Sequence, residues 1–207
     1  MARARINIVT SKQQISTGVN KTLTKAMNKA LTEAAGKVKR VAYPIIKNAL
    51  ISSSEIQSLK SGILKAEFGL DSDRTGELID TIMSSLDVVV TKVRGGKHSR
   101  SGSIAIVMQP NNYANLLSQG FASQSTEDGT LLPWLSWLLT LGDKIIIADF
   151  GVTLGDFGRS GGGRMEKSSS PFKVSSQFSG TPNNNFITRA IASTAPTIQK
   201  ILQNSIK

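Results

Sequence analysis

Several residue types that carry protein chemistry are missing or scarce in this chain of 207 residues. It contains no cysteine, which excludes a disulfide framework, a thiolate zinc site and a cysteine nucleophile. Its single histidine, His98, stands between Lys97 and Arg100 in a segment that we expect to be a loop. Because neighbouring positive charge disfavours an imidazolium, we interpret His98 as a solvated loop residue and not as part of a serine triad or a metal site.

Acidic residues are the second scarcity. The chain has 14 Asp and Glu against 25 Lys and Arg, which gives a formal net charge of +11. This excess fits an anionic partner such as nucleic acid or membrane phosphate, but it could equally keep an assembling subunit soluble, and both interpretations stay open. No acid stands in an apolar context that would raise its pKa, so we expect no carboxylate pair for acid–base catalysis and no enzyme.

Long hydrophobic runs are absent as well. The most apolar window, 131–141, is interrupted by Pro133 and Ser136 and is shorter than the roughly 20 residues that a spanning helix needs. We therefore expect no transmembrane segment and no membrane partner. The start of the chain is basic without a sustained apolar stretch, which does not fit a secretory signal and favours the cytoplasm.

What is present first is a long amphipathic pattern. Between residues 15 and 46 apolar side chains recur every three or four positions, from Val19 to Ile45, which predicts one long helix. Its opposite face carries lysines and an arginine against a single acid, Glu33. A second periodic run, at 185–206, predicts a C-terminal helix with a bend or break at Pro196.

Helices and strands alternate between these two helices. Strands are predicted where β-branched residues cluster, and the first two form a hairpin with a basic tip at 94–102. The segment 155–170 is rich in glycine and serine and is predicted to be mobile until assembly orders it. Helices are predicted at 54–68, 75–86, 111–119 and 132–141, and strands at 87–93, 103–108 and 144–152.

Two short motifs imitate ligand sites incompletely. Asp71-Ser-Asp-Arg-Thr-Gly resembles the opening of a calcium loop, but Ile82 stands where the bidentate glutamate belongs, so we interpret the acids as helix caps. Gly158-Arg-Ser-Gly-Gly-Gly-Arg lacks the Gly-Lys-Ser/Thr ending of a P-loop and is interpreted as a loop. No metal and no cofactor are expected.

Three further motifs occur in a fixed order. Arg74-Thr-Gly-Glu-Leu-Ile-Asp-Thr-Ile matches the pattern Arg-Thr-Gly-x-Leu-x-x-Ser/Thr-Ile before a first strand. Tyr113-Ala-Asn-Leu-Leu-Ser-Gln-Gly matches a Tyr-Ala segment ending in glycine, with Gln119 where an acid is usual. Asn185-Phe-Ile-Thr-Arg-Ala-Ile matches a Pro-Phe-x-x-x-Ala entry to a C-terminal helix, with Asn in place of Pro. In this order they resemble the tail-completion, or head–tail joining, family of tailed bacteriophages.

The resemblance implies a structural protein of the virion neck, assembled in the host cytoplasm. It implies a ring, usually of six copies, between portal or connector proteins and the tail terminator, tube or sheath, through which packaged DNA passes without sequence-specific contact. The expected fold is α+β, with a small, mostly antiparallel sheet packed by the long N-terminal helix and the C-terminal helix. One domain would span 1–207, with a loop-rich insertion at 121–179 that looks more like neck proteins of contractile-tailed phages.

Candidate site residues follow from charge and from isolated apolar groups. The candidates for facing DNA are basic residues of the hairpin and the glycine-rich loop: Lys92, Arg94, Lys97, Arg100, Arg159 and Arg164. The candidates for assembly contacts are large apolar residues, which could instead anchor the loop to its own core: Phe157, Phe172, Phe178, Trp134 and Trp137.

Two alternatives to the neck ring remain open. The first is the adjacent tail terminator, which also forms a ring and which the sequence does not separate from the neck protein. The second is a sequence-independent DNA-binding protein, which the charge of +11 and the basic helix favour.

Overall fold

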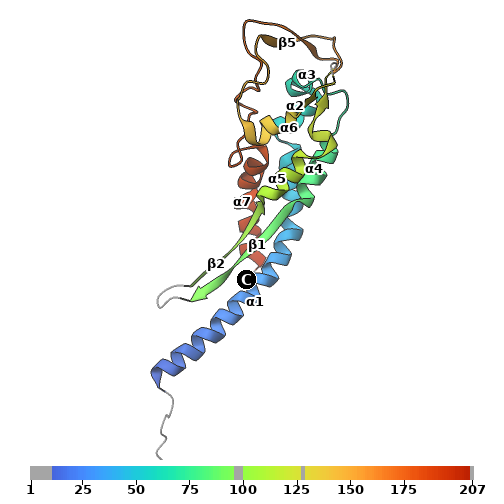
Figure 1. The fold of residues 1–207 in the computed structure, drawn as a ribbon. Helices are drawn as coiled ribbons and strands as arrows, with labels where there is room; N and C mark the ends of the chain where they lie inside the picture. The colour runs from blue at the N-terminus through green and yellow to red at the C-terminus, as the bar shows by residue number, and fades with distance from the viewer. Residues whose placement is uncertain (1–10, 96–99, 127–128, 206–207) are drawn as a thin grey trace, which may run out of the picture. The chain divides into compact units, whose positions relative to one another are not determined.

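The computed structural model describes residues 11–95, 100–126 and 129–205. Its architecture is α+β, as predicted, with a long N-terminal helix, a C-terminal helix and small antiparallel sheets of two strands each (Figure 1). The chain divides into two compact units: unit 1 comprises 1–39 and 88–106, and unit 2 comprises 40–87 and 107–207. The prediction of one domain over 1–207 stays a prediction.

Helix α1 runs from Lys12 to Ile51 and extends the predicted helix at both ends. It begins with a capping box, in which the Gln14 N–H donates to Ser11 Oγ at 3.2 Å and the Ser11 N–H donates to Gln14 Oε1 at 3.0 Å. This polar pair precedes the apolar periodicity, so a start at Ile15 was placed too late.

In unit 1, a hairpin lies alongside α1 (Figure 1). Its strands, β1 (Leu86–Gly95) and β2 (Arg100–Met108), are longer than predicted, so both ends of the expected loop tip belong to strands. The Val93 N–H donates to Asn28 Oδ1 of α1 at 2.7 Å. A Cβ at Gly102 would lie 2.6 Å from Leu31 Cδ1, so glycine is required for this close approach of strand and helix.

In unit 2, the helix predicted at 54–68 is two helices, α2 (Ser54–Ser61) and α3 (Ile63–Glu67). Gly62 between them is extended, with φ −119° and ψ −158°. The buried Ser58 Oγ accepts the N–H of Leu64 at 3.0 Å, which begins α3 in a new direction. The apolar periodicity continues across Gly62, so the pattern did not reveal the break. Helix α4 (Thr75–Ser84) begins where it was predicted.

The strand predicted at 144–152 was wrong over 144–149, because β5 is Phe150–Leu154. Asp149 has a φ of 59°, a left-handed conformation that strand residues do not adopt. Before it, Ile147 instead forms an isolated bridge with Phe172. The segment predicted to be a mobile loop contains β6 (Gly163–Lys167), which pairs antiparallel with β5.

The rest of unit 2 consists of short elements and the C-terminal helix α7 (Phe186–Ser205). Helix α7 continues through Pro196, so of the bend or break expected there, the break does not occur. The predicted helix at 132–141 becomes a π-helix at Trp137 and ends at Gly142, whose φ is 67°. The short elements are α5 (Pro110–Leu117), η1 (Gly120–Ala122), β3 (Gln124–Ser125), β4 (Leu131–Leu132), α6 (Trp134–Ser136) and η2 (Trp137–Leu141).

The core lies in unit 2, where the C-terminal part of α1 and the helices after it bury their apolar faces. Among the described residues, no helix is long and apolar enough to cross a bilayer. The largest fully buried side chains are Ile46, Leu50, Leu59, Leu64, Leu78, Ile82, Leu116, Leu135, Leu138, Leu139, Phe186 and Ile187.

Candidate nucleic-acid interface

Charge is divided unequally between the two units. The sequence of unit 1 holds twelve Lys and Arg and one acid, whereas unit 2 holds thirteen of each. The whole formal charge of +11 therefore belongs to unit 1, and unit 2 is neutral. Because a local excess of positive charge attracts polyanions, unit 1 is the candidate interface for nucleic acid.

Within unit 1, helix α1 carries a row of lysines. Lys21, Lys25 and Lys29 are four residues apart, so they share one face and follow each other about 6 Å apart along the axis. All three are exposed. The only acid of the unit, Glu33, lies 3.9 Å from Lys29, and this exposed pair neutralises little of the charge.

The hairpin adds positive charge on one face of its first strand. Lys92 and Arg94 are two residues apart and both exposed, while Val93 between them is buried towards α1. Of the other two predicted hairpin residues, Lys97 lies outside the described residues, and only the backbone of Arg100 is described, in β2.

The two predicted arginines of the glycine-rich loop lie in unit 2 and bind their own chain. Arg159 donates from Nε to the carbonyl oxygen of Gly69 at 3.2 Å and from Nη1 to that of Ser125 at 2.6 Å. Arg164 lies 2.6 Å from Glu166 Oε1 and over the ring of Phe157, 5.0 Å from its centroid. Both arginines therefore hold the fold of unit 2.

The predicted assembly residues are mostly buried within unit 2. Phe172, Phe178, Trp134 and Trp137 expose less than a tenth of their surface, and the Trp134 indole N–H donates to the carbonyl oxygen of Phe121 at 2.9 Å. In this conformation they anchor the insertion to its own core. Phe157, which is 38% exposed, is the one of the five that offers a ring to a partner.

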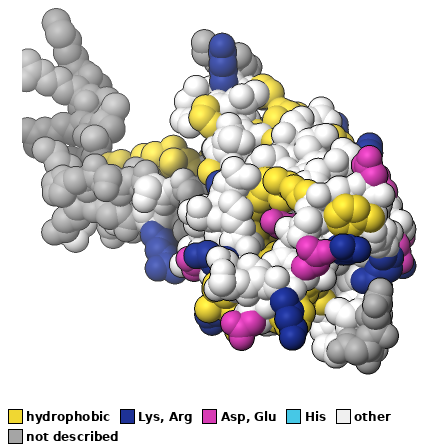
Figure 2. Space-filling view, turned by 90° about the horizontal axis from the view of Figure 1, so that it is seen from above, with side chains coloured by type: hydrophobic (Ala, Val, Ile, Leu, Met, Phe, Trp, Pro, Cys, Tyr) yellow, Lys and Arg dark blue, Asp and Glu magenta, His cyan; other side chains and the backbone are white. Residues whose placement is uncertain are grey.

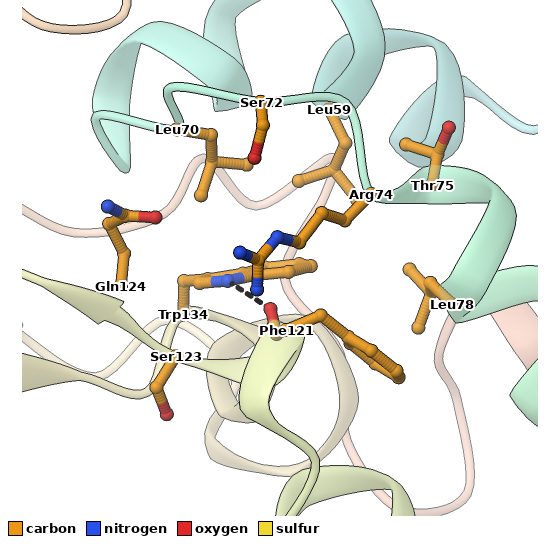
Figure 3. Close-up of a pocket in the computed structure, with 10 residues that line it drawn as sticks. All are labelled: Leu59, Leu70, Ser72, Arg74, Thr75, Leu78, Phe121, Ser123, Gln124 and Trp134. Carbon is orange, nitrogen blue, oxygen red and sulfur yellow. Dashed lines mark hydrogen bonds between the residues drawn. The ribbon is translucent and has the colours of Figure 1, made fainter.

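The residues of the three sequence motifs come together in unit 2. Arg74 and Leu78 of the first motif line a small pocket with Phe121, which follows the second motif, and with Trp134 (Figure 3). The side chain of Arg74 points into this pocket, whose volume of about 20 Å³ holds no more than a water molecule. The motif residues here pack the fold and leave no room for a substrate.

The second and third motifs meet at Asn185. Its Nδ2 donates to the Tyr113 hydroxyl at 3.4 Å and to the carbonyl oxygens of Leu139 and Thr181 at 3.3 and 2.9 Å. Its Oδ1 accepts two backbone N–H groups in the first turn of α7, which caps that helix. Asn185 therefore fixes the entry to α7.

The described acids bear on two expectations from the sequence, one about a metal site and one about a helix cap. Among the described residues, no group of three or more His, Asp or Glu is placed to hold a metal ion. Asp73 accepts hydrogen bonds from the hydroxyl and N–H of Thr75, which lower its pKa. It thereby satisfies the first N–H of α4, although the N-cap residue itself is Arg74, which makes no side-chain cap bond. The expectation that no acid stands in an environment that raises its pKa was wrong, because burial raises the pKa of Glu67 from 4.5 to about 7.

Sequence reasoning did not select the lysine row of α1 as a site. The signal was present, because lysines recur on one face of the predicted helix with almost no acid among them. The sequence prediction placed the DNA-facing residues in the hairpin and the glycine-rich loop instead, since binding residues often lie in loops. Comparison of the chain with protein-family models, curated proteins and solved structures found no match.

Proposed function

We propose that this protein is a non-catalytic structural subunit of the neck of a tailed phage, with unit 1 facing packaged DNA and unit 2 supplying the packed body. The observation that carries the proposal is the confinement of the whole net charge to unit 1. A neutral body can pack against neighbouring proteins without mutual repulsion, while a basic unit is attracted to DNA of any sequence.

The motif resemblance supports a place for this protein within the virion. It supports a ring of copies, usually six, between connector proteins and the tail terminator, tube or sheath, within the virion. The convergence of the motif residues in unit 2 supports a shared fold as the reason for the motifs, because Arg74, Tyr113 and Asn185 pack or bond within the chain. The tail terminator ring is the alternative within the same class.

A free, sequence-independent DNA-binding protein is the second candidate, because the same basic unit would serve it. The two functions differ in where the protein resides. We therefore propose peptide mass spectrometry and cryo-electron microscopy of purified particles. A ring of copies at the head–tail junction is expected, and absence from purified particles would overturn the neck function in favour of the free DNA-binding one.

A matched variant separates assembly from attraction to DNA. Particles should be grown with the triple variant Lys21→Gln, Lys25→Gln and Lys29→Gln in place of the unaltered protein. If unit 2 makes the assembly contacts, this variant is incorporated in normal amounts. Loss of the variant from particles that retain their DNA would mean that DNA alone recruits the protein, which contradicts a neck subunit.

A further inference from the structure

Unit 2 contains a cleft that the proposed function does not use. Its volume is about 410 Å³, and it lies between the end of α3 and the β5–β6 hairpin, which pack against each other. Figure 2 looks onto this end of unit 2, where hydrophobic side chains surround a hollow with charged groups beside it. The apolar walls are Ala66, Phe68, Leu132, Val152 and Met165.

Glu67 is the one acid among the described residues that line the cleft. Its Oε2 is buried and has no hydrogen-bond partner among the described residues. A buried polar atom without a partner is destabilising, so a donor that reached Oε2 would gain binding energy. Burial also raises the pKa of this carboxyl to about 7, so it is partly ionised near neutral pH.

Among the described lining residues, the other charged groups are Arg159 and Arg164, and each binds another group of the chain. Arg159 donates to the carbonyl oxygens of Gly69 and Ser125, and Arg164 pairs with Glu166. Burial is the sole cause of the raised pKa of Glu67, and neither arginine lowers it. Within the part of the chain that the structure describes, the acid therefore has no countercharge paired with it.

We propose that this cleft is a docking site for an arginine or lysine side chain of a neighbouring protein. The cationic head donates to Glu67 Oε2, and the aliphatic stem lies on the apolar walls, as such side chains do on protein surfaces. An acidic group would be repelled by Glu67, and an apolar group would leave Oε2 unsatisfied. This site consists of unit 2 residues, whereas the proposed DNA contact consists of unit 1 residues. An experiment can therefore refute one proposal and leave the other standing.

The test uses the full chain and a capped arginine, N-acetyl-arginine-N-methylamide. Nuclear magnetic resonance should show shifts of the backbone amides of Glu67, Phe68 and Gly69, with a Kd on the order of 1 mM for a ligand of this size. Capped citrulline, which has nearly the same shape without the charge, should bind at least about tenfold more weakly. Equal binding of citrulline, or no shift of these amides with capped arginine, would overturn the proposal.

Two variants identify the recognising group. Glu67→Gln keeps the size of the side chain and should weaken binding of the capped arginine about tenfold, whereas Glu77→Gln, an exposed glutamate on α4, should change nothing. Tighter binding of capped glutamate than of capped arginine would assign recognition to Arg159 and Arg164 and refute the role of Glu67.

The pH dependence gives a readout that a purely structural role would not produce. Only ionised Glu67 attracts the cation, so affinity for capped arginine should rise between pH 6 and 8, as the pH passes the raised pKa of about 7. The arginines of the cleft keep their charge throughout this range. Glu67→Gln should abolish the trend, and a trend of the same size in that variant would contradict the assignment.

Discussion

The contact between unit 1 and DNA can be tested by removing the lysine row of α1. The perturbation is the triple variant Lys21→Gln, Lys25→Gln and Lys29→Gln. Glutamine keeps a long, helix-favouring side chain, and all three positions are exposed, so the fold should not change. The variant lowers the formal charge from +11 to +8.

The expected magnitude follows from counterion release. Each phosphate contact contributes about 0.9 to the slope of log K against log salt, so the loss of three contacts should reduce the slope by about 2.7. At about 0.1 M salt the same relation corresponds to roughly 500-fold weaker binding. If the slope falls by less than about 2.7, the size of the fall indicates how many of the three lysines contact phosphate, at about 0.9 for each contact.

The assay is fluorescence anisotropy with two duplexes of unrelated sequence over a range of salt concentrations. A matched control, Lys144→Gln, Lys167→Gln and Lys173→Gln, removes three exposed lysines from unit 2 and should leave the slope almost unchanged. Equal losses in both variants would show that net charge alone matters. An unchanged slope in the α1 variant would refute the role of this helix.

Three further predictions concern stability and are measured by urea denaturation. Arg189→Met should destabilise the fold by about 2–3 kcal/mol, because the carboxylate of Glu55, whose side chain is 4% exposed, loses the arginine that lies 2.5 Å away. The double variant with Glu55→Gln should recover most of this loss, because no buried charge is then left unpaired. Asn185→Ala should cost about 2–3 kcal/mol, because it removes the cap of α7 and the donor to Thr181, whereas Asn185→Asp should cost less because it retains the cap. Because the pKa of Glu67 is raised in the folded protein, its contribution to stability is present below pH 4.5 and is lost as the pH rises to about 7. The free energy of unfolding should fall by roughly 1–2 kcal/mol over this range, after allowance for solvent screening. Glu67→Gln should remove this fall, and a pH-independent free energy of unfolding of the unaltered protein would contradict the burial of the acid.

The spacing of apolar residues was sufficient to predict a helix or strand where that element buries one continuous face. The helical repeat from Val19 to Ile45 predicted α1, and the β-branched residues after Asp87 predicted β1. It was insufficient at Gly62, because a buried helix pair keeps its apolar repeat through a break that the Ser58 hydroxyl stabilises. The apolar spacing was insufficient again at Asp149, because its left-handed backbone prevents β5 from beginning before Phe150.

The candidate site was predicted in part. Lys92 and Arg94 are exposed on one strand face, as a DNA contact requires, while Arg159 and Arg164 bind groups of their own chain. The sequence placed all six basic candidates on equal terms. Only the folded chain reveals which guanidinium groups are already occupied, because their partners, Gly69 and Ser125 for Arg159, are distant in sequence.

The sequence by itself determined the composition limits of this protein: no cysteine chemistry, one histidine, an excess of positive charge, and an α+β order of elements. These properties depend on residue counts and local spacing. The tertiary structure alone decided that the charge belongs to one unit, that the motif residues Tyr113 and Asn185 meet, and that Glu67 is half-buried with its Oε2 atom enclosed. Each depends on contacts between residues far apart in the chain, which local pattern does not encode.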